Sequence, residues 1–119
     1  MAAYSEKVLD HFKNPRNSGE LASATHRAEF TNPVCGDVLK LAARIEKDNI
    51  VEARFLCRGC TTAIACASIL CERISGMAVR DARRINGQWI SETLGELPAE
   101  TMHGAHLAAD ALKLLLKNS

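Results

Sequence analysis

Four of the five cysteines fall in the stretch from Phe55 to Gly76. Cys57 and Cys60 form a C-x-x-C pair, and Gly59 between them allows a sharp turn. Cys60 is expected just ahead of a helix N-terminus, where backbone N–H groups and the helix dipole favour a thiolate over a thiol. A thiolate is both the nucleophilic form of cysteine and its metal-binding form. The stretch therefore indicates either metal binding or dithiol redox chemistry.

Other candidate ligands lie outside this stretch. In Cys35-Gly36-Asp37 the glycine lets the backbone bend, so that a thiolate and a carboxylate two residues apart can converge. A turn aspartate beside an incidental cysteine has the same pattern, so the motif alone leaves both interpretations open. His103 stands near the start of the last expected helix, where a lone histidine is usually a surface residue. His106 lies one turn further and could share its face.

The remaining cysteines and histidines have simpler interpretations. Cys57 shares its parity with Val51, Ala53 and Phe55, which predicts that it faces the core. Cys66 and Cys71 sit in a helix that is apolar at nearly every position, as in a central buried helix, and we expect them to be packing residues. His11 and His26 are expected on the surface.

Strands come first in this chain and helices second, which predicts an α+β fold: a small antiparallel sheet with helices packed on one face. Alternating apolar and polar residues predict strands over 38–46 and 50–57, joined by a tight hairpin turn at 47–49. A short strand is expected at 27–31. The expected helices cover 4–13, with an apolar face of Tyr4, Val8, Leu9 and Phe12, then 62–75, capped by Thr61 or Thr62 and ended by Gly76, then 78–85, 88–94 and a last helix to about 117 with Leu107, Ala111, Leu114 and Leu115 on one stripe.

Length and composition restrict the class of protein. A chain of 119 residues, 47% apolar, suggests one domain, residues 1–119, with one core. The net charge of +1, without a basic or acidic block, gives no indication of nucleic-acid or membrane-surface binding. No apolar run approaches the roughly 20 residues that span a bilayer, and the N-terminus lacks a signal-peptide core. We therefore expect a cytoplasmic protein, in which five cysteines favour metal ligands, reactive thiols or core residues over disulfides.

Several motifs together carry a family resemblance. The segments YSEKVLDHFKNPRN, CGDVLKL, ARF followed by GC and AIA, LP, and LAADALK occur in the order and spacing of the U-type iron–sulfur cluster assembly scaffolds. These are the IscU proteins, the N-terminal domain of NifU and the SufU proteins. The resemblance covers almost the whole chain. It implies an α+β domain with a three-stranded antiparallel sheet and helices on one side.

The resemblance also implies a function and a site. Such scaffolds accept sulfur from a cysteine desulfurase and iron from a donor, build a [2Fe–2S] cluster and pass it to apo-proteins, and they commonly bind zinc at the same site. The family's ligand positions match Cys35, Cys60 and His103, and its aspartate, which tunes cluster lability, matches Asp37. The implied cofactors are iron or a [2Fe–2S] cluster, with zinc after purification in air. The implied partners are a desulfurase and apo iron–sulfur proteins.

Two positions depart from the family pattern. The family's third cysteine directly follows the ligand histidine, but this chain has Gly104 there. Two thiolates, a carboxylate and an imidazole suit Zn²⁺ or Fe²⁺, whereas a [2Fe–2S] cluster more often takes four cysteines. Replacing Gly104 with cysteine is expected to be tolerated, since helix propensity improves. The family's LPPVK loop, which meets an Hsp70-type chaperone, is Leu97-Pro98-Ala99-Glu100-Thr101 here, so no chaperone partner is implied.

The leading hypothesis is a scaffold or carrier that is not itself an enzyme. One alternative is a cluster-incompetent paralogue that binds and regulates a cysteine desulfurase. Another is a dithiol oxidoreductase that uses Cys57 and Cys60, although the expected core position of Cys57 counts against it.

Overall fold

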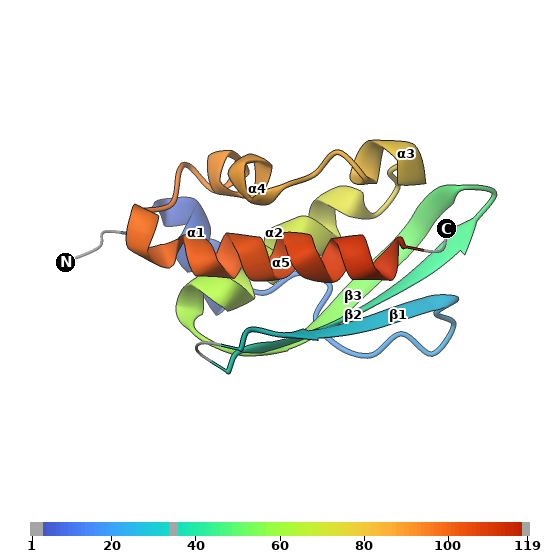
Figure 1. Ribbon diagram of the computed structural model, residues 1–119, viewed down its shortest axis with the longest axis horizontal. Coiled ribbons are helices and arrows are strands. Elements are labelled where there is room, and N and C mark those ends of the chain that lie inside the picture. The colour runs from blue at the N-terminus through green and yellow to red at the C-terminus, as the bar shows by residue number, and fades with distance from the viewer. Residues whose placement is uncertain (1–3, 34–35, 118–119) are drawn as a thin grey trace.

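A computed structural model describes residues 4–33 and 36–117 of the chain (Figure 1). In chain order the described elements are α1 (Glu6–Lys13), β1 (His26–Thr31), β2 (Val38–Glu46), β3 (Asn49–Arg58), α2 (Thr61–Ile74), α3 (Val79–Ala82), α4 (Gly87–Thr93), the 3-10 helix η1 (Ala99–Thr101) and α5 (Met102–Leu115). The strands form one antiparallel sheet in the order β1-β2-β3, and the helices pack on one side of it, so the expected α+β architecture is confirmed.

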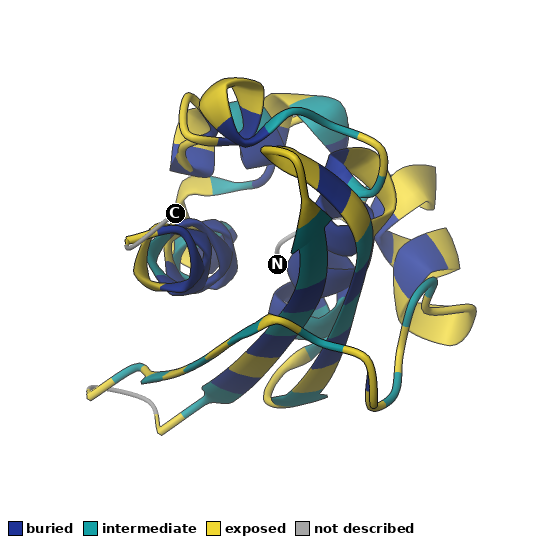
Figure 2. Ribbon diagram, turned by 90° about the vertical axis from the view of Figure 1, so that its right-hand side faces the viewer, coloured by how far each residue is buried: buried dark blue, intermediate teal, exposed yellow. Residues whose placement is uncertain are grey.

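The central hairpin follows the expected alternation with one exception. Leu39, Leu41 and Ala43 on β2 are buried, and Figure 2 shows buried bands alternating with exposed ones along the strands. On β3, however, Val51 is 41% exposed while Ile50 is buried. The cause is a β-bulge: Arg44 pairs with Glu52 and Ile45 with Ile50, so Val51 has no partner and the parity of the strand changes there.

Helices α2 and α5 provide most of the apolar surface that covers the sheet. Cys66 and Cys71 on α2 are fully buried, as expected from its apolar sequence. On α5, seen end-on in Figure 2, the buried positions face the rest of the molecule. Leu114 was expected on the same stripe as Leu107, Ala111 and Leu115 but is 44% exposed, so that part of the expectation is wrong. Helix α3 is shorter than the expected 78–85. Within the described residues, no helix combines the length and apolarity that crossing a membrane requires.

Helix α1 differs from the expected helix in two respects. It begins at Glu6, because the Oγ of Ser5 accepts a hydrogen bond from the Val8 amide and caps it. Of its expected apolar face only Val8 is buried. The other three apolar residues, Tyr4, Leu9 and Phe12, are each 38% exposed.

The helix is turned so that His11, rather than its aromatic residues, faces α2. His11 is 6% exposed, and its Nδ1 lies 2.7 Å from the Oγ of Ser68, which also accepts a hydrogen bond from the Arg16 amide at 2.8 Å. Because Ser68 Oγ already accepts from Arg16, its own proton can go to Nδ1 of a neutral imidazole. The expected surface position of His11 is therefore wrong, and this histidine joins α1 to α2.

This contact predicts a pH-dependent stability. Burial, followed by the nearby Arg16, holds the pKa of His11 below its ordinary 6.5, against the smaller opposing effects of Glu72 and Asp10. As the pH falls below 6.5, His11 therefore becomes protonated more readily in the unfolded chain than in the folded one. The contribution of His11 to stability is present above pH 6.5 and is lost as the pH falls below it. Urea unfolding from pH 7.5 to 5.5 should show this loss.

The same titration with His11→Gln should show a smaller loss of unfolding free energy over that range. His26→Gln is the matched control, since the ring of His26 hydrogen-bonds the side chain of its neighbour Thr25 at an exposed site. A pH dependence that is the same in the parent and in His11→Gln would contradict the assignment.

Candidate metal centre

Three of the four expected ligands meet where separate elements begin or end. Asp37 directly precedes β2, Cys60 lies between β3 and α2, and His103 is in the first turn of α5. One ligand atom from each lies within 4.8 Å of the other two. These ends lie on the same side of the molecule, the left in Figure 1. The fourth expected ligand, Cys35, lies outside the described residues.

Cys60 and His103 are in direct contact. The Sγ of Cys60 lies 3.2 Å from Nε2 of His103, and Cys60 is exposed to solvent. Cys60 is itself the N-cap residue of α2, with extended backbone angles and no side-chain capping bond, so the expectation that Thr61 or Thr62 caps the helix is wrong. The thiol thus remains available to a ligand at the helix N-terminus, where a negative charge is favourable.

Asp37 offers a buried oxygen without a hydrogen-bond partner. Its Oδ2 is inaccessible to solvent and receives no hydrogen bond from the described residues. A Cβ atom at Gly59 would lie 3.0 Å from both Oδ2 and Cγ of Asp37, so only glycine leaves the carboxylate this room. An unpaired buried carboxylate oxygen is costly, and a cation in this position would remove that cost.

Gly104 has a packing role that the sequence did not reveal. It is buried, and a Cβ atom there would lie 3.0 Å from the backbone N of Ala63, 3.0 Å from Cγ2 of Thr62 and 3.1 Å from its carbonyl carbon. Its missing side chain lets the first turn of α5 lie directly on the first turn of α2. This contact places His103 beside Cys60, so the glycine is more than a lost ligand.

His106 does not belong to this group. A Cβ atom at Gly87 would lie 2.7 Å from Nδ1 of His106, so the ring lies against the start of α4. The expectation that His103 and His106 could share a face therefore does not hold at this site.

The cysteines other than Cys60 differ in burial. Cys57 packs against the core, as its parity predicts, but is only half-buried. Burial, then the charges of Asp37 and Cys60, raise its pKa to about 11. Burial also raises the pKa values of Cys66 and Cys71, which fits packing residues. The position of Cys57 within electrostatic reach of two site residues was not expected.

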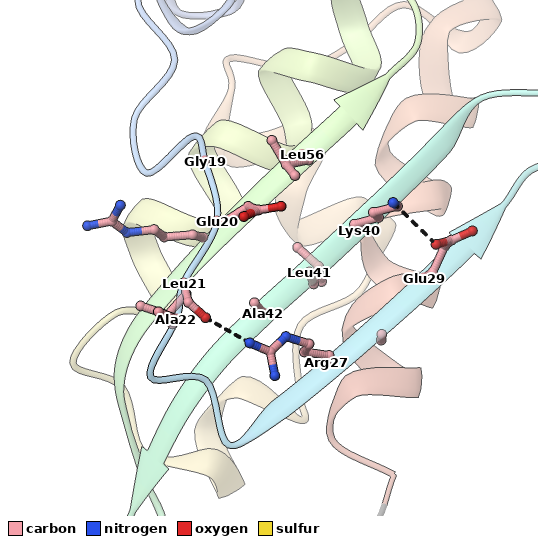
Figure 3. A pocket seen from close by; sticks show the side chains of 12 residues that line it. Gly19, Glu20, Leu21, Ala22, Arg27, Glu29, Lys40, Leu41, Ala42 and Leu56 are labelled. Atoms are coloured by element: carbon pink, nitrogen blue, oxygen red, sulfur yellow. Dashed lines mark hydrogen bonds and ion pairs between the residues drawn. The ribbon is translucent and has the colours of Figure 1, made fainter.

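The opposite face of the sheet carries a hollow of about 570 Å³ beneath the connector 19–22 (Figure 3). Two of its three cationic side chains are in ion pairs, Lys40 at 3.8 Å from Glu29 and Arg54 at 2.8 Å from Glu52, and Arg27 donates to the carbonyl oxygen of Leu21. The residues that line this hollow include no cysteine or histidine. The candidate metal group lies elsewhere in the fold.

The group as a whole combines a thiolate, a carboxylate and an imidazole. Such mixed donors suit Zn²⁺ and Fe²⁺. Residues 3–118 match the family model described as the NifU-like N terminal domain. The chain belongs to this family. The resemblance identified from its motifs is thereby confirmed.

The named relatives agree with this membership. The chain is 41% identical over 115 residues to the iron–sulfur cluster assembly scaffold protein IscU of Escherichia coli K12, covering 93% of this chain and 89% of that protein. It is 40% identical over 110 residues to IscU 1 of Archaeoglobus fulgidus, covering 92% and 72%.

The fold is shared with FiSufU of Fervidobacterium islandicum AW-1, with a TM-score of 0.77, 23% identity and coverage of 95% and 96%. It is also shared with the N-terminal part of a NifU-like protein from Brucella abortus, with a TM-score of 0.63, 15% identity and coverage of 95% and 80%.

The close approach at Gly104 predicts that substitutions there are harmful. Overpacking against backbone atoms costs about 1–3 kcal/mol, and the gain in helix propensity returns only about 1 kcal/mol, so Gly104→Ala should lose up to about 2 kcal/mol in urea unfolding. Gly87→Ala is the control, because its new Cβ would meet only the exposed ring of His106, which can turn away. A Gly104→Ala protein as stable as the parent would show that the two helices separate without cost.

Proposed function

We propose that this chain is an iron–sulfur cluster assembly scaffold or carrier that binds its cargo through Cys35, Asp37, Cys60 and His103. The observation that carries the proposal is the convergence of Asp37, Cys60 and His103 within 4.8 Å, with an unpaired buried oxygen on Asp37. Its IscU relatives at 40–41% identity support the same function, since they are named as assembly scaffolds. The cargo is iron or a [2Fe–2S] cluster, and zinc occupies the site after purification in air.

The wider role that we propose is carried over from the family resemblance and from the expectations drawn from the sequence. The chain acts as one scaffold domain over residues 1–119, in the cytoplasm, and is not an enzyme. It takes sulfur from a cysteine desulfurase and passes clusters to apo iron–sulfur proteins. We include no Hsp70-type chaperone, because the segment Leu97–Thr101 lacks the family's recognition sequence.

The two alternatives have less support. The pKa of about 11 at Cys57 leaves its thiol protonated at neutral pH, which opposes a role as the attacking thiol of a dithiol oxidoreductase. A paralogue that only regulates a desulfurase would need no metal ligands, yet the described residues bring three together. Reconstitution with iron and sulfide distinguishes a scaffold from such a regulator.

Metal content gives the first test of the proposed site. The protein purified in air should contain one zinc ion per chain by elemental analysis, with an affinity that falls in acid because thiolates and neutral imidazole are the binding forms. His103→Ala should lower the zinc affinity by at least about tenfold, since a direct ligand should matter as much as the groups that orient ligands. His106→Ala is the matched control, a helical histidine three residues away that lies against α4. Equal affinities in the two variants, or full retention of zinc by Cys60→Ala, would place the metal elsewhere.

Cluster lifetime gives a second test, directed at Asp37. The family resemblance assigns this position to keeping the cluster labile, and a carboxylate oxygen exchanges more readily than a thiolate. Asp37→Ala should therefore slow the loss of a reconstituted cluster, measured as the decay of its visible absorption under air. Glu29→Ala, on the opposite face of the sheet, should leave the decay unchanged. Faster or unchanged decay in Asp37→Ala would contradict the assignment of this family role to Asp37.

A further inference from the structure

On the helix side of the centre there is little room for a third thiol. The residue after His103 is Gly104, and a side chain there would press against the backbone of Ala63 and Thr62 at 3.0–3.1 Å. To accept a cysteine here the neighbouring atoms of α2 would have to give by a few tenths of an ångström, directly beside His103. The packing of this chain is therefore matched to a glycine on the helix side.

On the sheet side, Cys57 of β3 supplies a thiol near the centre. Cys57 pairs with Leu39 across the β2–β3 ladder. Asp37 lies two residues before Leu39, and Gly59 lies two residues after Cys57. Asp37 and Gly59 are in contact, since a Cβ atom at Gly59 would lie 3.0 Å from the carboxylate. Because side chains two residues apart share a face of a strand, Asp37 and Cys57 are diagonal neighbours on one face, at a spacing of roughly 7–8 Å that two such short side chains do not bridge directly.

Burial separates Cys57 from the other described cysteines. Cys66 and Cys71 are fully enclosed, whereas Cys57 is half-buried and Cys60 exposed. The charges of both Asp37 and Cys60 act on the Cys57 thiol, which places it within electrostatic reach of two members of the centre. Of the described thiols, Cys57 is thus the one besides Cys60 that both approaches the centre and can exchange with solvent.

We propose that Cys57 is a thiolate ligand of the cluster, supplied from β3 in place of the helix residue that follows His103. The inference rests on the proposed scaffold function. Binding needs no oxidant: the Cys57 thiol releases its proton to solvent, and its sulfur takes a coordination position on iron, as thiolates do in iron–sulfur proteins.

Cargo size makes this role selective. Asp37, Cys60 and His103 lie close enough to hold a single ion, and Cys57 is outside this compact group. A two-iron cluster is larger and divides its ligands between two irons, so it can reach a thiol at the edge of the group. Cys57 is therefore required for the cluster and dispensable for zinc.

The experiment compares the parent with Cys57→Ala and with Cys66→Ala, which removes a fully buried thiol from α2. Each protein is reconstituted anaerobically with ferrous iron and sulfide, and iron, labile sulfide and the lifetime of the visible absorption are measured. Zinc affinity is measured separately by chelator competition. We expect Cys57→Ala to lose cluster lifetime by about tenfold or more, the scale found when groups around a metal are removed. Its zinc affinity should equal that of the parent, and Cys66→Ala should match the parent in both measurements.

A second measurement uses the unaltered chain, so that it does not depend on the folding of a variant. At alkaline pH, where its thiolate forms, Cys57 should be alkylated in the metal-free protein and protected in the cluster-loaded protein, as read by mass spectrometry of the modified peptides. Equal alkylation in both states would overturn the inference.

The outcomes separate the inference from the function on which it rests. If Cys57→Ala keeps the cluster yield and lifetime of the parent, Cys57 is not a ligand and the scaffold function stands. If Cys57→Ala loses zinc as readily as cluster, the claimed selectivity is wrong. If the parent itself assembles no cluster from iron and sulfide, the scaffold function fails and the inference fails with it.

Discussion

The close contact between the first turns of α5 and α2 is the constraint on which the metal centre depends. At Gly104 the two helices approach so closely that a Cβ atom would lie 3.0–3.1 Å from atoms of Ala63 and Thr62. This contact sets the 3.2 Å separation between Cys60 at the start of α2 and His103 at the start of α5. Because helix packing is dense and resists small expansions, even one added methyl group should be felt at the centre.

A second glycine plays the corresponding part on the sheet side. Gly59 gives the Asp37 carboxylate room at the end of the β2–β3 hairpin, where the Oδ2 atom lies buried without a partner among the described residues. The chain thus uses two missing side chains to bring three donors together from a strand start, a helix N-cap and a helix first turn. The close approach of backbone segments therefore determines where the donors lie.

Much of the architecture could be predicted from the sequence, because periodicity records burial directly. The alternation of β2, the apolar α2 and the order of strands before helices all gave correct expectations. Val51 failed because a β-bulge is a property of two paired strands and leaves no mark in one strand's alternation. His11 failed because its partner, Ser68, is distant in sequence, and a histidine that is buried with such a partner looks the same in sequence as a surface one.

At the candidate site, too, the residue types could be read from the sequence but their packing could not. Cys60, Asp37 and His103 could be named from motif and resemblance because ligand chemistry depends on residue type. The reason for Gly104 could not, since a missing side chain in a sequence indicates a lost ligand as readily as a close contact. Cys57 was assigned to the core from parity alone, whereas its exposure depends on how far the strand end extends beyond the helices that cover it.

Few hydrogen bonds fix the orientation of the donor side chains, which suits a cargo that must be released. Structural zinc sites are closed, and a histidine that holds a permanent metal usually donates its second ring nitrogen to a carboxylate or carbonyl. Here Cys60 is exposed, and the His103 ring makes no hydrogen bond to the described residues other than the contact with Cys60. With its position fixed by the backbone and its orientation left free, His103 can take up a metal without holding the ring rigidly. A centre built in this way favours exchange over permanent retention, which is what a carrier of clusters requires.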